Sequence, residues 1–293
     1  MNNLEKIINK YDLNIRKYHK KNNIRILDTD KGKFVIKRKN NNENSIYEYL
    51  LNKNFDYLIE KEELDDYIIY PYIEEINIPK EEKAIDLINI LALLHNKTTY
   101  YKQVVLDDVK ELYEKLNNNI DNLYKYYYDL QDIIEQKVYM NPAQYLLIRN
   151  VSLFYSALSF AKTKLNEWYE IKIKQIKERV VLLHNKPSID HLLVGEKKQL
   201  ISWNEYERDI PIYDFIYFYK KNYLDFDMSS LFDIYQSRFN YTKDEYLLFI
   251  TILSIPEKII FTKNNYNDCE NVFKIVKYLM VTRDFILSKY EEK

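Results

Sequence analysis

The chain has 293 residues, of which 46% are hydrophobic and 30% charged, and its formal net charge is -1. This length permits two lobes with a sizeable core, and the balanced charge gives no overall field that would favour nucleic acid or an anionic membrane. The single Cys269 excludes an internal disulfide framework and a cysteine-built zinc site, so we expect a reducing, cytoplasmic setting. The first 21 residues are polar, and no stretch approaches the roughly 20 apolar residues of a membrane helix, so we expect neither a signal peptide nor membrane insertion.

Glycine is rare, with only Gly32 and Gly195 in the whole chain, and both lie in sequences typical of hairpin turns, DKGK and VGEKK. Loops that hold phosphates with backbone N–H groups need glycine, because only glycine lets the backbone approach closely. A P-loop and a dinucleotide-binding fingerprint are therefore excluded. We interpret the thirty tyrosines, together with the Asn and Lys runs, as the mark of an AT-rich genome and of solvated loops, not as a nucleic-acid surface.

The first part of the chain is predicted to contain mostly strands. After an initial segment with helical spacing, strand-like residues occur around 13–18. Two further strands, 24–28 and 33–38, flank the turn at Gly32. The run YIIYPYI at 67–73 is rich in β-formers and contains a proline, which fits a strand that leads into a hinge.

Helices are predicted for most of the remaining chain. One begins at Ser45, the expected N-cap, with Glu48 three residues later at capping-box spacing. Another begins after Pro79 and ends near His95, which we interpret as a helix-end residue and not as a ligand. Residues 106–179 are helical in pattern almost throughout, with a break near Asn141 and Pro142.

The most informative stretch is HNKPSIDHLLVGEKKQLISW, residues 184–203. It follows an apolar strand at 180–183, begins as a polar loop, and continues as a hairpin over Gly195 that joins 191–194 to 199–203.

This strand, loop and hairpin resemble the catalytic segment of the aminoglycoside and choline phosphotransferases, which belong to the protein-kinase-like superfamily and carry HGDxxxxN, a short hairpin and IDF/W(D/E). His184 keeps its place, but Lys186 replaces the catalytic aspartate, His191 the metal-binding asparagine and Ser202 the metal-binding aspartate. Phosphoryl transfer needs a carboxylate to orient the attacking hydroxyl and oxygen ligands for magnesium. A lysine ammonium cannot accept a proton unless its pKa falls by several units, and imidazole and a neutral hydroxyl are poor replacements for those oxygens. We therefore expect no catalytic residues and no metal site.

Two further segments carry the same resemblance. Asp214 matches an aspartate that follows a proline in the family, and it is expected to cap the next helix and to hold the His184 loop through hydrogen bonds. Residues 242–260, with Pro256, Glu257 and Lys258 near their end, resemble the CotS-like spore-coat branch of the family.

The resemblance also implies a nucleotide site in the small lobe. Lys37, in the strand KFVIKR, stands where the family holds the nucleotide phosphates, although a surface lysine on an edge strand fits the sequence equally well. Glu48 is the candidate acid to pair with Lys37, a use that competes with its capping role, and Glu43 is the second candidate. Tyr70 and Tyr72 lie in the segment that meets the adenine through its backbone.

The resemblance extends from about residue 24 to about residue 271 and predicts the fold class. We expect an α+β, two-lobed protein-kinase-like fold, with a small β-rich N-lobe at residues 1–75. The larger, mainly helical C-lobe at residues 76–293 would carry the degenerate catalytic loop and hairpin.

Three functions remain open. The favoured one is a catalytically inactive kinase-like protein, a pseudokinase, with a structural or scaffolding role, a protein partner and, from family context, a place in spore-coat assembly. The second is a sensor that binds ATP without magnesium. The third is an active small-molecule phosphotransferase in which Asp190, Asn204, Glu205 or Asp209 replaces the lost ligands or base.

Overall fold

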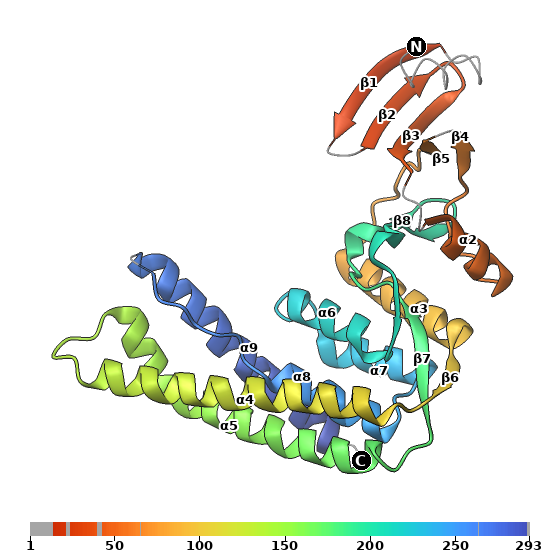
Figure 1. The fold of residues 1–293 in the computed structure, drawn as a ribbon. Coiled ribbons are helices and arrows are strands. Elements are labelled where there is room, and N and C mark those ends of the chain that lie inside the picture. The colour runs from red at the N-terminus through yellow and green to blue at the C-terminus, as the bar shows by residue number, and fades with distance from the viewer. Residues whose placement is uncertain (1–13, 22–23, 40–42, 65, 263, 292–293) are drawn as a thin grey trace. The chain divides into compact units, whose positions relative to one another are not determined.

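The computed structural model describes residues 14–21, 24–39, 43–64, 66–262 and 264–291. Contacts divide the chain into two compact units (Figure 1). The small unit contains Met1–Ile90 and Lys186–Tyr206, and the helical unit contains Leu91–Asn185 and Glu207–Lys293. The hairpin segment is thus grouped with the N-terminal strands. The lobe boundary at residues 75 and 76 stays a prediction.

The small unit is built on an antiparallel five-stranded sheet with the order β1-β2-β3-β5-β4. Its strands are β1 (Ile15–Lys21), β2 (Ile24–Thr29), β3 (Gly32–Arg38), β4 (Glu62–Leu64) and β5 (Tyr67–Pro71). The predicted strands on both sides of Gly32 are confirmed. This glycine has φ 119°, a backbone conformation that other residues rarely adopt. The helical pattern predicted at the start of the chain lies outside the described residues.

The two faces of this sheet differ in their burial. Side chains alternate along a strand and paired residues share a face, so Leu27, Ile36 and Ile69 gather on one side, where they form a buried core cluster. Val35 and Lys37 lie on the opposite face with Tyr70, which is paired with Val35, and all three are half-buried.

The helix after the sheet's third strand begins earlier than predicted. It is α2 (Glu43–Asn52), and its start at Glu43 makes the N-cap prediction for Ser45 wrong. Serine in the first turn of a helix costs little stability, so its presence does not fix where a helix begins. The position of α2 is determined instead by its apolar side, where Ile46 and Leu50 are buried.

Residues 186–206 add four short elements to the small unit. They are η1 (Ile189–His191), β8 (Leu192–Val194), β9 (Lys198–Leu200) and η2 (Trp203–Glu205), where η denotes a 3₁₀ helix. The predicted hairpin over Gly195 is confirmed, but its second strand ends at Leu200 and does not reach Trp203. The buried Trp203 indole donates to the Leu200 carbonyl at 2.9 Å and meets the Phe55 ring edge-on at 6.1 Å.

The helical unit combines a small sheet with a layer of helices. Its strands, in the order β10-β7-β6, are β6 (Tyr100–Gln103), β7 (Lys177–Leu183) and β10 (Glu207–Asp209). Its helices are the end of α3 (Lys80–Thr98), which begins in the small unit, and α4 (Leu106–Glu135), α5 (Pro142–Lys172), α6 (Ile212–Asn222), α7 (Met228–Arg238), α8 (Lys243–Ser254) and α9 (Asn265–Glu291). The long helices α4 and α5 lie side by side, and α5 also packs on α8 and α9 (Figure 1).

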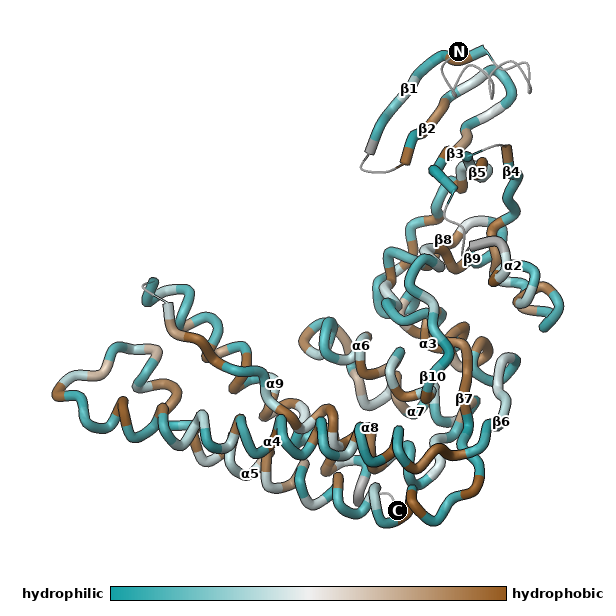
Figure 2. Tube along the Cα trace, in the orientation of Figure 1, coloured by the Kyte–Doolittle hydropathy of each residue, from teal (hydrophilic) through white to brown (hydrophobic). Residues whose placement is uncertain are grey.

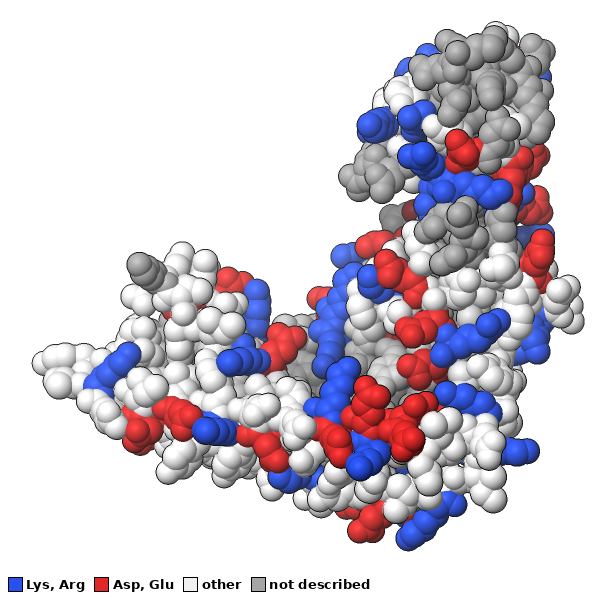
Figure 3. All heavy atoms as spheres, in the orientation of Figure 1, with Lys and Arg blue, Asp and Glu red and all other residues white. Residues whose placement is uncertain are grey.

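Aromatic side chains fill the core of the helical unit. Phe232 and Phe249 stack at 5.1 Å with their planes 5° apart, and Phe215 meets the edge of Phe232 at 5.2 Å, so α6, α7 and α8 share one cluster. Hydrophobic and hydrophilic positions alternate along the helices, as expected for helices with one buried side (Figure 2). Acidic and basic side chains are interspersed over the visible face of this unit (Figure 3). None of the helices in the described ranges is long and apolar enough to cross a membrane.

Candidate functional site: the loop and hairpin at residues 184–205

Lys37 in β3 reaches a residue 167 positions later in the chain. Its ammonium donates to the Asn204 side-chain oxygen at 2.7 Å, and both residues belong to the small unit. The sequence resemblance gives Lys37 the role of holding nucleotide phosphates. In the structure the Lys37 ammonium lies beside Asn204, in the segment that the resemblance aligns with the metal-binding residues, and the Asn204 amide is neutral.

Ser202 sets the direction of the chain into η2. Its backbone has φ 70° and ψ 47°, the left-handed conformation that few residues other than glycine adopt. The turn leads directly into the anchored Trp203, so that the next residue, Asn204, meets Lys37. Ser202 therefore serves the backbone path here, at the position where the family has a metal-binding carboxylate.

Lys186, which the sequence resemblance aligns with a catalytic aspartate, pairs with a carboxylate of η2. Its ammonium lies 3.4 Å from the Glu205 carboxylate, and both side chains are about half exposed. The backbone carbonyl of Lys186 is 3.0 Å from Nδ1 of His191. A carbonyl can only accept a hydrogen bond, so Nδ1 is the donor and the imidazole is held against the loop.

The segment around η2 therefore suits an anion better than a metal ion. Because Asn204 and Glu205 are consecutive, the ammonium groups of Lys37 and Lys186 both approach the same short helix. Two ammonium groups beside this helix, whose one acidic residue is Glu205, can attract phosphate oxygens. Across the ranges that the structure describes, no three His, Cys, Asp or Glu side chains are arranged to hold a metal ion.

The other acids considered as replacements lie in two places. Asp190 is an exposed residue of η1 in the small unit. Asp209 lies in β10 of the helical unit, where its carboxylate accepts from the Ile210 N–H at 2.7 Å and burial raises its pKa.

The expected nucleotide residues are only partly brought together. Tyr70 lies on the Lys37 face of the sheet. Tyr72 follows β5, where its N–H donates to the Lys33 carbonyl and the Lys33 ammonium lies 5.5 Å above its ring. Glu48 lines a cavity over the opposite face of the sheet, so the structure does not bring the expected acid to Lys37. The side chain of Glu43 lies outside the described residues.

In the helical unit, Asp214 holds the start of the loop. This fully buried carboxylate accepts from the backbone N–H of His184 at 2.8 Å and of Asn185 at 2.7 Å. Asn185 stands at the family's glycine position and has φ 71°, which asparagine tolerates better than most residues. Asp214 lies in the first turn of α6 and is not its N-cap, which is Pro211.

His95 is the residue that sequence reasoning undervalued. It is fully buried at the end of α3, where Nε2 lies 3.0 Å from the Asp214 carboxylate and Nδ1 lies 2.6 Å from the Tyr235 hydroxyl. A carboxylate can only accept, so Nε2–H donates to Asp214, and burial raises the pKa of Tyr235, so its hydroxyl remains protonated beside Nδ1. A histidine directly after the apolar run at residues 90–94 was the available signal for this role.

Comparison with known proteins identifies the fold through structure alone. No family model and no curated protein matches the sequence. The structure is similar to an aminoglycoside phosphotransferase from Alicyclobacillus acidocaldarius, with a TM-score of 0.68 and 13% identity over 97% of this chain and 94% of that one. It is also similar to the AMP-bound spectinomycin phosphotransferase APH(9)-Ia, with a TM-score of 0.54 and 12% identity over 95% of this chain and 97% of that one.

Identities this low establish the fold and leave the activity open. The predicted fold class is confirmed, because the small antiparallel sheet and the larger helical part correspond to those of these enzymes over nearly the whole chain. This chain has the two-lobed, protein-kinase-like fold of the aminoglycoside phosphotransferases.

Proposed function

We propose that this chain is a catalytically inactive kinase-like protein that acts by binding a protein partner. The observation that carries the proposal is the ion pair between Lys186 and Glu205. The family's base position needs a group that accepts a proton from the attacking hydroxyl. Here it holds an ammonium, which has no lone pair to accept that proton, and whose partner is the Glu205 carboxylate.

The two metal positions support the same conclusion. His191 offers an imidazole, whose nitrogen is a poor ligand for the hard magnesium ion. Ser202 offers a neutral hydroxyl on a residue that sets the backbone turn into η2. The side-chain oxygen of Asn204 already accepts a hydrogen bond from the Lys37 ammonium. Magnesium therefore loses the anionic oxygens on which family chemistry depends.

The test is ATP turnover in the presence of magnesium, measured for the wild-type chain and for Lys37→Met. We expect phosphate release at the background rate for both proteins, because neither base nor metal ligands are present. Magnesium-dependent release by the wild type that Lys37→Met abolishes would overturn the proposal.

The partner-binding role has its own test. A scaffold uses its surface and not the nucleotide lysine, so a protein captured by the wild-type chain should also be captured by Lys37→Ala. Loss of the captured protein in that variant would count against a scaffold. The spore-coat setting is supported only by the sequence resemblance at residues 242–260.

A second candidate function is binding of ATP without magnesium. It is favoured by the approach of Lys37 and Lys186 to η2, since the second ammonium supplies positive charge at a place where the family uses a metal. The half-buried Val35 and Tyr70, on the same sheet face as Lys37, offer an apolar surface for a base.

Thermal unfolding in EDTA tests this candidate. ATP should raise the unfolding temperature of the wild type, because a ligand that binds only the folded state stabilises it. Lys37→Met and Lys186→Met should each reduce that rise. Asp190→Asn, an exposed residue of the same loop, serves as the matched control and should leave it unchanged. If ATP does not raise the unfolding temperature, with or without magnesium, ATP binding is rejected and the scaffolding function remains.

A further inference from the structure

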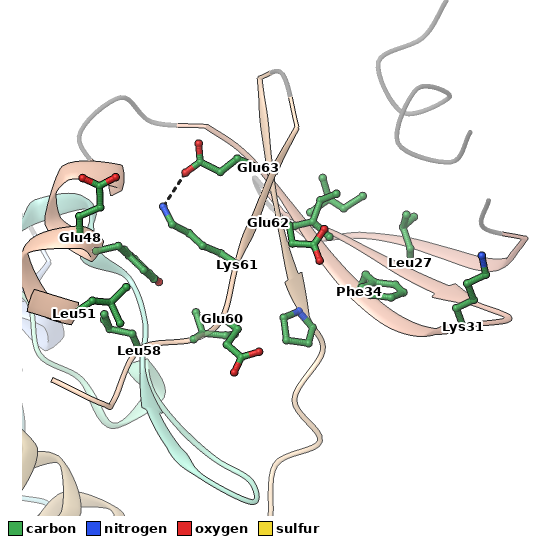
Figure 4. Close-up of a pocket in the computed structure, with 15 residues that line it drawn as sticks. Leu27, Lys31, Phe34, Glu48, Leu51, Leu58, Glu60, Lys61, Glu62 and Glu63 are labelled. Atoms are coloured by element: carbon green, nitrogen blue, oxygen red, sulfur yellow. Dashed lines mark hydrogen bonds and ion pairs between the residues drawn. The ribbon is translucent and has the colours of Figure 1, made fainter. Parts of the chain in front are cut away.

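A large cavity lies in the small unit, on the face of the sheet opposite Lys37 (Figure 4). Its volume is about 890 Å³, within the range of about 300 to 1,000 Å³ that is typical of small-molecule sites. Side chains from the sheet, from α2 and from residues 58–63 line it. Because strand alternation separates it from the Lys37 face, the cavity is distinct from the candidate site at residues 184–205.

The floor of the cavity is apolar. Leu27, Ile36 and Ile69 are buried in the sheet core and face the space together with the partly buried Phe34. Leu58, from the segment before β4, closes another side. Such a surface favours a ligand with an apolar body, which gains free energy when it leaves water.

The rim of the cavity is acidic. It carries Glu48, Glu60, Glu62 and Glu63, against only two ammonium groups, those of Lys31 and Lys61. Glu63 is engaged by Lys39 at 2.6 Å and by Lys61 at 3.1 Å. The other three carboxylates are exposed and have no hydrogen-bond or ion-pair partner within the part of the chain that the structure describes. This rim attracts a cation.

The chain itself places an ammonium in this cavity. Lys61 extends across the space toward Glu63, and its side chain is only 11% exposed (Figure 4). Its ammonium lies 4.3 Å from the centre of the Tyr47 ring as well as beside the Glu63 carboxylate. An aromatic face and a carboxylate around one ammonium are a typical arrangement for recognition of an organic cation. Lys61 therefore occupies the position that a ligand cation would take.

We propose that this cavity binds a small amphiphilic amine, whose apolar body lies on the Leu27 and Phe34 floor and whose ammonium replaces that of Lys61 between Tyr47 and Glu63. The ligand must displace Lys61, so the wild-type affinity is reduced by the free energy that holds this side chain in place. The free carboxylates on the rim add attraction for a cation over a neutral or anionic molecule of the same shape.

Three probes of matched shape test the charge preference in calorimetric titrations of the full chain without nucleotide or metal. They are phenylbutylamine, phenylbutanol and phenylbutyrate, which carry a cation, a neutral group and an anion. We expect the amine to bind at least about fivefold more tightly than the alcohol, and the acid to bind least. Equal binding of all three probes would overturn the proposal.

Variants locate the site. In Lys61→Met the amine affinity should rise about tenfold, because no internal ammonium competes beside Tyr47 and the Glu63 oxygen that Lys61 engages becomes available, while Lys39 keeps its pair with the other oxygen. Lys31→Met removes the other lysine of the lining, which lies on the β2–β3 turn, and should leave the affinity within about twofold of wild type. The triple variant Glu48→Gln, Glu60→Gln and Glu62→Gln should weaken amine binding and spare alcohol binding.

An unchanged ratio of amine to alcohol affinity in Lys61→Met would contradict the site. Lys61→Gln removes the charge but keeps a polar end on a side chain one atom shorter, and it provides a second measurement if the methionine variant does not fold. The titrations do not involve ATP, so a failure to bind the amine would not affect the proposed loss of catalysis. Equally, magnesium-dependent ATP turnover would not affect the proposed amine site.

Discussion

Asp214 illustrates how one buried carboxylate can hold the backbone of a loop in place. It receives two backbone N–H groups from His184 and Asn185 and a third hydrogen bond from His95. None of these contacts involves metal or nucleotide. The backbone of the loop can therefore keep its path while the side chains that follow it diverge.

Removing that carboxylate should be costly. Asp214→Ala leaves two buried amides and the His95 ring without their acceptor, so we expect a loss of about 3 to 5 kcal/mol in the free energy of unfolding. Asp121→Ala is the matched control, because its carboxylate pairs with Lys162 at 2.5 Å with both side chains nearly half exposed, and it should cost less than about 1 kcal/mol. Urea unfolding measures both, and equal losses would contradict the role of Asp214.

Asp244 gives a prediction for pH. Burial opposes its ionisation, but the Lys172 ammonium and hydrogen bonds from Gln175 and Thr242 outweigh burial and hold the pKa of Asp244 below its ordinary value. A carboxyl whose pKa is lower in the folded state stabilises the fold above its unfolded pKa, about 3.9, and this stabilisation disappears as the pH falls through the lowered folded pKa.

The difference in unfolding free energy between wild type and Asp244→Asn should therefore be largest above about pH 4 and should shrink at lower pH. Urea unfolding across an acidic pH series measures it. A difference that stays constant or grows on acidification would contradict the assigned ion pair.

At the scale of elements, helix α5 begins with a complete capping box. The Asn141 side chain accepts from the Gln144 N–H at 2.8 Å, and the Gln144 side chain accepts from the Asn141 N–H at 3.2 Å, with Pro142 in the first turn. Asn141→Ala removes an N-cap and should lower the free energy of unfolding by about 1 kcal/mol.

The control for the cap lies on the same helix. Asn150→Ala removes an amide that donates to the Leu146 carbonyl within α5, and its effect should stay within about 0.5 kcal/mol because alanine favours the helix. Denaturant unfolding followed by far-UV circular dichroism compares the two variants. A larger loss for Asn150→Ala would show that the cap is not what fixes the start of α5.

Several elements were predictable because their signals are local. The turn at Gly32, the hairpin over Gly195 and the break before α5 each depend on residues that lie next to one another in the sequence. The start of α2 was not, because the serine at position 45 fits both a cap and a first turn. The left-handed backbone of Ser202 was not predictable either, because serine has no local preference for that conformation.

At the scale of the whole molecule, the fold was predictable and the pairing of the site residues was not. The order of strands, helices and hairpin along the chain indicated the kinase-like fold, which structural similarity confirms. The contacts of Lys37 with Asn204 and of His95 with Asp214 join residues 167 and 119 positions apart. Contacts between residues so far apart depend on how the whole chain folds, and no local sequence pattern predicts them.

The central claim is that metal-dependent phosphoryl transfer has been lost, and the most direct test is the affinity for ATP measured with magnesium and with EDTA. We expect the wild type to show no gain from magnesium, whereas a variant with Lys186→Asp, His191→Asn and Ser202→Asp should gain one. Wild-type binding about tenfold or more tighter with magnesium, a difference of about 1.4 kcal/mol, would contradict the account.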